Sequence, residues 1–177
     1  LNEEYDEIDI YSGTEMDILP DGSLDYDNEV LAQLDYVIAA IHQSFNQSED
    51  EIMKRLEVAC KNPYVRHIAH PTGRIIGRRP GYKPNIEKLM KLAEETNTIL
   101  EINANPKRLD LNAETVRKYP NVKLTINTDA HHTNHLEFMK YGVATAQKGF
   151  VAKDRVVNAL SREEFKSLIE NNIKLRK

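Results

Sequence analysis

The stretch Leu124–His132, with the sequence LTINTDAHH, decides how the chain is interpreted, because an alternating apolar run stops there at an acid and two imidazoles. Such alternation is typical of a β-strand, in which side chains two residues apart face the same way. We therefore predict a strand that presents Asp129 and His131 as metal ligands. The alternative is that Asp129 caps a following helix and that His131 and His132 lie in solvent in its first turn. His135 has helical metal-pair spacing to His131 but lacks the adjacent acid of metalloproteases, so it stays outside the predicted ligand set, as does His132.

Length and composition point to one domain. A chain of 177 residues can bury a sizeable core, and 40 % apolar with 29 % charged residues is ordinary for a globular protein. The single cysteine, Cys60, excludes an internal disulfide, and no apolar run approaches the roughly 20 residues of a membrane helix. We expect a cytoplasmic protein without a membrane partner. The chain begins at Leu1 in acidic, helix-like sequence, which suggests a piece of a longer protein.

Charge is divided sharply along the chain. Residues 1–51 hold 15 acidic side chains and no lysine or arginine, whereas residues 52–177 hold 13 acidic and 24 basic ones, which gives about −15 and +11. A basic surface of that size can bind a polyanion such as nucleic acid, but scattered solvated lysines explain it equally well. One cluster is dense enough to be a candidate phosphate-binding loop, namely Arg74, Arg78, Arg79 and Lys83.

Strand-like and helix-like segments alternate. We expect strands at residues 8–16, 36–42, 65–69, 98–103 and 122–128. We expect helices at residues 28–34, 49–60, 86–93, 112–118, 135–148 and 163–171, with capping signals at Ser48, Asn85 and Ser161. This alternation is typical of an α/β protein with a parallel sheet made of repeating βα units.

Candidate ligands repeat at the length of one βα unit. Glu15 and His42 are 27 residues apart, His70 follows after 28, Glu101 after 31 and Asp129 after 28. Each lies near the end of a predicted strand, so together they should converge on one mouth of a barrel, where (β/α) barrels carry their active sites. Imidazole with carboxylate suits zinc, manganese or iron, and the pattern indicates a hydrolytic metal centre. A simpler explanation stays open, since every βα protein repeats at about this length.

Two neighbouring positions are assigned other roles. His67 precedes His70 by three residues and should face the opposite way along a strand, so we interpret it as structural or solvent-exposed. Glu101 and Asn103 should face the same way on their strand, and we predict them as hydrogen-bond partners rather than ligands.

Four motifs follow one another along the chain: Gly13-Thr14-Glu15, the strand ending at His42, the corner His70-Pro71, and Thr128-Asp129-Ala130-His131. In order and spacing they resemble the later motifs of the PHP (polymerase and histidinol phosphatase) phosphoesterases. More narrowly, residues 15–26, 70–74 and 101–111 are similar to the C-terminal PHP domain of bacterial family X DNA polymerases. The resemblance covers nearly the whole chain. It implies a distorted (β/α)7 TIM-like barrel, here a single PHP domain fragment over residues 1–177 with about five βα units and the first two missing.

The resemblance also implies a ligand set. Glu15, His42 and His70 would hold one metal, and Glu15 would bridge to a second that also uses Asp129. A third metal would keep only His131. By the same resemblance, the other ligands of a trinuclear PHP site would belong to the two strands that are expected to be missing. We therefore expect about one divalent metal here, manganese or zinc with iron as a further candidate, against up to three in a complete domain.

The reaction implied is metal-dependent hydrolysis of phosphate esters, as 3′-to-5′ exonuclease or phosphatase activity in DNA repair. DNA would be the partner of the parent polymerase, and this chain alone would be impaired. Arg74 and Arg79 would act as catalytic residues that neutralise substrate phosphate.

Three alternatives to this reaction stay open. They are a histidinol-phosphatase-like small-molecule phosphatase, an amidohydrolase-type enzyme, and a non-catalytic PHP scaffold or DNA-binding module. The amidohydrolase is disfavoured because the chain lacks an early His-x-His motif. Missing strands would leave open sheet edges, which predicts a homodimer, a swapped assembly or an open C-shaped sheet.

Overall fold

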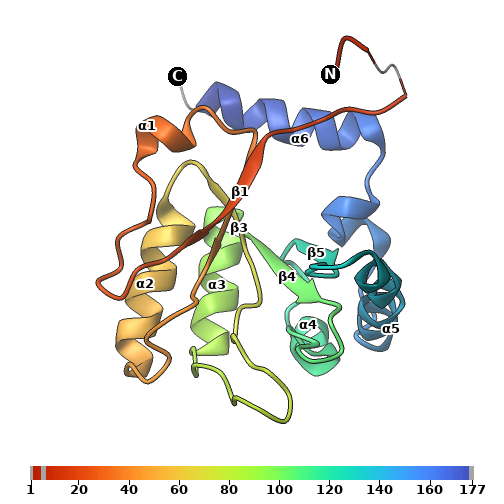
Figure 1. Cartoon of the computed structure of the whole chain (residues 1–177). Helices are drawn as coiled ribbons and strands as arrows, with labels where there is room; N and C mark the ends of the chain where they lie inside the picture. Colours follow the sequence, from red (N-terminus) through yellow and green to blue (C-terminus); the bar gives the residue numbers. More distant parts are fainter. Residues whose placement is uncertain (1, 5–6, 176–177) are drawn as a thin grey trace.

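Five parallel strands form one sheet in the order β1-β2-β3-β4-β5 (Figure 1). The structure, a computed structural model, describes residues 2–4 and 7–175, with side chains as far as residue 171. The expected helix-like start of the chain falls in part on Leu1 and residues 5–6, which lie outside the described residues. The strands are β1 (Gly13–Asp17), β2 (Tyr36–Ala40), β3 (Val65–Ile68), β4 (Ile99–Asn103) and β5 (Leu124–Asn127). The helices are α1 (Asn28–Leu31), α2 (Glu49–Lys61), α3 (Ile86–Thr96), α4 (Ala113–Lys118), α5 (Met139–Lys148) and α6 (Arg162–Leu175), with 3-10 turns η1 (Thr133–Phe138), η2 (Lys153–Arg155) and η3 (Val157–Ala159).

The predicted α/β class and parallel sheet are confirmed. The first strand is shorter than expected, since residues 8–12 precede it, and the second ends two residues before His42. Strands β1 and β5 are the two edges, and no ladder joins them within the described residues. The observed architecture is therefore a partial TIM-like sheet.

The two faces of the sheet differ in chemistry. On one face, alternate residues such as Met16, Ile68 and Leu100 pack into a core with Leu56 of α2 and Leu89 of α3. The opposite face carries polar side chains from four strands, and they line a cavity of about 250 Å³. Parallel strands buried on both faces usually have continuous apolar sequence, so a polar inner face indicates a functional site.

Helix starts follow the expected capping chemistry. Ser48 and Glu51 form a reciprocal capping box at α2, and Asn85 caps α3 by accepting from the backbone N–H of Lys88. At α6, the backbone N–H of Ser161 donates to Glu164 at 2.8 Å, while the Glu164 N–H donates back to Ser161 Oγ at 3.2 Å. These bonds satisfy N–H groups that would otherwise lack partners, and they fix where each helix begins.

Helix α6 crosses one end of the sheet, beside the N-terminal segment (Figure 1). Arg66 of β3 donates to the carbonyls of Leu168 and Ile169 at 3.1 and 2.9 Å. Phe165 stacks on Tyr36 at the start of β2, with ring centroids 6.3 Å apart, and also lines the polar cavity. Helix α6 therefore closes the cavity at the N-terminal ends of the strands and leaves the opposite ends for the site.

Gly142 lets α5 approach the sheet closely. An added Cβ would collide with Ile126 Cγ2 and lie 2.7 Å from Ala104 Cβ. We expect Gly142→Val to lower the free energy of unfolding by about 1–3 kcal/mol through overpacking. The exposed control Ala144→Val on the same helix should cost at most about 0.7 kcal/mol through helix propensity. Urea unfolding of both variants measures this, and equal losses would contradict the close packing.

Candidate metal centre

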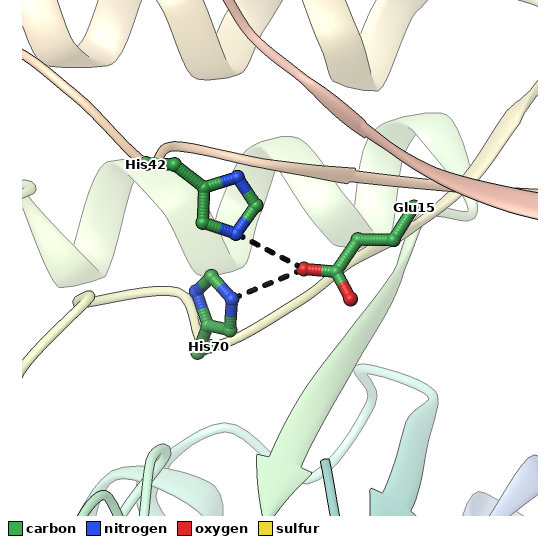
Figure 2. A group of neighbouring side chains, drawn as sticks. All are labelled: Glu15, His42 and His70. Carbon is green, nitrogen blue, oxygen red and sulfur yellow. Dashed lines mark hydrogen bonds and ion pairs between the residues drawn. The ribbon is translucent and has the colours of Figure 1, made fainter. Parts of the chain in front are cut away.

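Three side chains meet at the C-terminal ends of β1, β2 and β3 (Figure 2). His42 Nε2 and His70 Nε2 each lie 3.2 Å from the same oxygen, Oε1 of Glu15. One ligand atom from each residue lies within 4.8 Å of the others. The His70 side chain is 3 % exposed, whereas Glu15 and His42 are 38 % and 42 % exposed, so the cluster can be reached from solvent on one side.

The backbone explains why these side chains converge. Glu15 lies within β1 and points to the polar face, while His42 and His70 each lie two residues beyond their strands. His70 has a positive φ of 30°, its N–H donates to Glu101 Oε2 at 2.6 Å, and its carbonyl accepts from Gly73 N–H at 2.7 Å. This turn aims the imidazole back across the strand ends toward Glu15.

Electrostatics favour a charged cluster. Hydrogen bonds from His42 and then His70 hold the pKa of the Glu15 carboxyl well below its usual range. The pKa of His42 is raised, chiefly by its hydrogen bond to Glu15. Burial acts in the opposite direction, and the hydrogen bond to Asp17 raises the pKa further. Asp17 Oδ1 accepts a hydrogen bond from His42 Nδ1. A carboxylate on the outer ring nitrogen fixes the tautomer and orientation of a metal-binding histidine.

The donor set fits a divalent metal. One carboxylate and two imidazoles are ligands that zinc, manganese and iron accept. The Nε2 atoms of His42 and His70 both point at the Glu15 oxygen, and Asp17 occupies the remaining nitrogen of His42. Three protein ligands leave coordination positions open for a substrate or water.

The structure places Asp129 beside this cluster but not in it. Asp129 lines the same cavity as Glu15 and His70. Its Oδ2 lies 3.0 Å from Arg108 Nε and accepts from Asn103 Nδ2 at 3.3 Å. The carboxylate is therefore held by the protein itself and directed at the cavity.

His131 stays close to Asp129, with its Nδ1 3.6 Å from Asp129 Oδ1, but not through the extended backbone that the sequence suggested. Strand β5 ends at Asn127 and Asp129 has a positive φ of 51°, so the extended backbone assumed from the sequence is wrong here. His131 is 80 % exposed, and its Nδ1 donates to the Asp129 carbonyl at 2.9 Å. The alternative that Asp129 caps a helix is also wrong, because His132 is the N-cap of η1.

A buried polar network extends from His70. Glu101, 4 % exposed, accepts from Asn103 Nδ2 and Asn127 Nδ2 at 3.0 Å each in addition to the His70 N–H. Burial raises the pKa of the Glu101 carboxyl. Asn103 also donates to Asp129, so the network joins two predicted metal ligands, His70 and Asp129. The prediction that Glu101 and Asn103 are hydrogen-bond partners on one face is confirmed.

His67 differs from its predicted orientation. It lines the same cavity as His70 because β3 ends at Ile68 and the chain then turns, which cancels the alternation assumed for a longer strand. It is 1 % exposed, so the solvent-exposed interpretation is wrong and the structural one holds. Its Nε2 is hydrogen-bonded to Thr125 Oγ1 at 3.0 Å, whereas Nδ1 has no partner within the described part of the chain.

The two predicted catalytic arginines lie in the loop after His70. Arg74 Nε donates to the Arg108 carbonyl at 2.7 Å, and its Nη2 donates to the Leu109 carbonyl. Arg79 donates twice to the Gly73 carbonyl and stacks over Phe45. The structure therefore does not bring either guanidinium into the Glu15 cluster.

Two residues of the site were not predicted. Asp17 lies two residues after Glu15 on β1, and that same-face spacing was a usable signal. Arg108 lies in an irregular loop, where no periodicity indicates its pairing with Asp129. Its Nη1 is buried and has no hydrogen-bond partner among the described residues.

Known proteins with similar sequences include a polymerase and phosphatases. The chain is 53 % identical over 174 residues to the DNA polymerase/3′-5′ exonuclease PolX of Bacillus subtilis, which covers 97 % of this chain and 30 % of that protein. It is 28 % identical over 170 residues to a "Probable phosphatase" of Thermoanaerobacter sp., 89 % of this chain and 67 % of that relative. A "Probable phosphatase" of Caldanaerobacter subterraneus is 36 % identical over 107 residues, 58 % of this chain and 40 % of that relative.

No protein-family model matches the chain. The chain spans less than a third of its PolX relative. The similarities to PolX and the phosphatases support a PHP-like domain of phosphoesterase type. None of the helices in the described residues has both the length and the apolar character needed to cross a membrane.

Asp17 provides a test of the metal centre. We expect Asp17→Asn to weaken binding of Zn²⁺ or Mn²⁺ by about 10- to 100-fold, because His42 loses the carboxylate that orients it. Asp25→Asn, which changes an exposed carboxylate, should leave the affinity unchanged. Isothermal titration calorimetry measures both, and identical affinities would show that Asp17 does not support a metal ligand.

The buried His67 predicts a dependence of stability on pH. Burial lowers the pKa of His67 to about 3. The unfolded state, with a histidine pKa of about 6.5, then binds the proton first, so stability is lost as pH falls below about 6.5. Between about pH 7.5 and pH 5 this histidine should account for about 2 kcal/mol of lost stability.

His67→Gln removes this titration and keeps a polar group near Thr125. We expect its urea-unfolding free energy to fall less than that of the unmodified chain over the same pH interval. Parallel losses in the two proteins would show that His67 is not the group responsible.

Proposed function

We propose that the chain is a fragment of the PHP domain of a family X DNA polymerase, with a metal-dependent phosphoesterase site that hydrolyses DNA phosphate esters in the 3′-to-5′ direction. The observation that carries the proposal is the convergence of Glu15, His42 and His70. The similarity to PolX of Bacillus subtilis supports the choice of DNA as substrate. We propose manganese or zinc as the metal, with iron as a further candidate, and about one ion in this chain.

The protein's contribution is to hold the ligands in place. Asp17 fixes the ring of His42, and Glu101 fixes the backbone of His70, so both Nε2 atoms stay directed at Glu15. The chemistry that a divalent metal supplies when bound at such a site is polarisation of a phosphate oxygen or a water molecule. The exposed side of the cluster, formed by Glu15 and His42, is where a phosphate ester would enter.

Arg74 and Arg79 are the proposed counter-charges for substrate phosphate. Backbone carbonyls hold both guanidinium groups in place, and within the described residues neither is ion-paired with a carboxylate. Cations fixed in advance need no reorganisation when a negative charge arrives. Asp129 and His131 are proposed, as the resemblance implies, to be ligands of two further metals in a complete domain.

A small-molecule phosphatase is the second candidate. It is favoured by the two phosphatase relatives, one of which is matched over 67 % of its length. The Glu15, His42 and His70 cluster could act on a DNA phosphodiester or on the phosphate ester of a small molecule. We propose that the protein is cytoplasmic. We also propose that it forms a homodimer or a swapped assembly through the open sheet edges at β1 and β5.

Loss of one ligand should abolish hydrolysis. We expect His42→Ala to reduce Mn²⁺-dependent release of 3′-terminal nucleotides from a labelled single strand by more than about 100-fold. Loss of a residue that only orients a metal ligand typically costs about 10- to 100-fold, and His42 is itself a proposed ligand. Gln43→Ala, which truncates the exposed neighbouring side chain, is the matched control. The assay uses excess protein and a single turnover, so that impaired activity is still measured.

Two outcomes would count against the proposal. Equal rates for His42→Ala and the unmodified chain would remove the metal centre from the reaction. Release of phosphate from small phosphomonoesters without release of nucleotides would favour the small-molecule phosphatase.

A further inference from the structure

Four aromatic rings form a column on the surface, in the segment that follows Asp129. His132, His135, Phe138 and Tyr141 recur at every third residue through η1 and into α5. Successive ring centroids lie 6.1, 4.9 and 6.2 Å apart, and the central pair is stacked with an interplanar angle of 20°. The column begins at His132, three residues after Asp129, which lines the same cavity as Glu15 and His70.

The column does not serve the core of the described fold. No residue of η1 is buried, and Tyr141 is 41 % exposed. Two apolar side chains beside the rings, Leu136 and Met139, are 63 % and 37 % exposed. Exposed aromatic rings offer their faces and edges to a flat apolar partner.

Positive charge surrounds the far end of the column. Tyr141 shares a cavity of about 350 Å³ with Arg74 and Lys148, and the residues lining that cavity include no acid. Lys140 Nζ lies 5.3 Å from the Tyr141 ring centroid. Arg74 also donates to the carbonyl of Arg108, the residue paired with Asp129, so these contacts connect the basic cavity to Asp129 in the cavity of the candidate metal centre.

We propose that this column is a stacking surface for the bases of a single DNA strand, with the strand's phosphates against Arg74 and Lys148. Aromatic rings beside cations along a groove are how proteins bind single strands without reading sequence. A duplex fits less well, because its base faces are already stacked on one another. The inference rests on the proposed function for its choice of DNA, and it deepens that function by specifying an unpaired strand next to the site.

Binding can be measured apart from hydrolysis. Fluorescence anisotropy with EDTA present compares a labelled oligothymidylate of about 12 nucleotides with an abasic strand of equal length and charge. We expect the strand with bases to bind at least about 5-fold more tightly. Tyr141→Leu should remove that difference and Tyr141→Trp should retain it. Tyr26→Leu, at a tyrosine that is 42 % exposed in the acidic part of the chain, should change nothing.

Three results would overturn the stacking surface. The first is equal binding of the strand with bases and the abasic strand, and the second is an equal effect of Tyr141→Leu and Tyr26→Leu on binding. The third is a Tyr141→Leu variant whose sedimentation coefficient changes while its DNA binding does not, which would indicate a protein interface. Nucleotide release with Mn²⁺ separates this inference from the proposed function. Base-dependent binding without release refutes only the hydrolysis, whereas release with equal binding of both strands refutes only the stacking surface.

Discussion

A single carboxylate oxygen, Oε1 of Glu15, lies 3.2 Å from the Nε2 atoms of both His42 and His70. The parallel sheet makes this possible, since it brings the C-terminal ends of β1, β2 and β3 to one edge. Bringing three polar groups together costs desolvation unless their partners are in place. In this fold the partners are other residues of the same site, such as Asp17 and Glu101.

The polar inner face is the second condition for the site. Glu101 is buried and accepts three hydrogen bonds, from His70, Asn103 and Asn127. A buried carboxylate left unpaired would be strongly destabilising, so this network must be complete for the sheet to tolerate it. The same network reaches Asp129 through Asn103. The geometry of the Glu15, His42 and His70 cluster therefore depends on the polar face as a whole.

Much of the fold could be predicted from local sequence patterns. The capping box at Ser48 and the apolar alternation of Leu124–Asn127 report directly on backbone conformation, because capping and burial are local constraints. The repeat from Glu15 to His42 to His70 indicated residues that the structure brings together, since each unit returns the chain to the same edge. Barrel closure is a tertiary property, and it is not seen in the described residues.

Positions just beyond strand ends were the least predictable. His67 and His131 were assigned by alternation, which holds only while the backbone stays extended. The positive φ values of His70 and Asp129 break that alternation. Arg108 was missed because its pairing with Asp129 joins two loops, and no sequence period relates loop residues.

We propose that Glu15, His42 and His70 hold a divalent metal, and X-ray absorption spectroscopy on the chain loaded with Zn²⁺ and dialysed tests this directly. We expect a retained ion whose inner shell contains two imidazole nitrogens at about 2.0–2.1 Å together with oxygen. A chain that retains no metal, or an ion bound without imidazole, would contradict it.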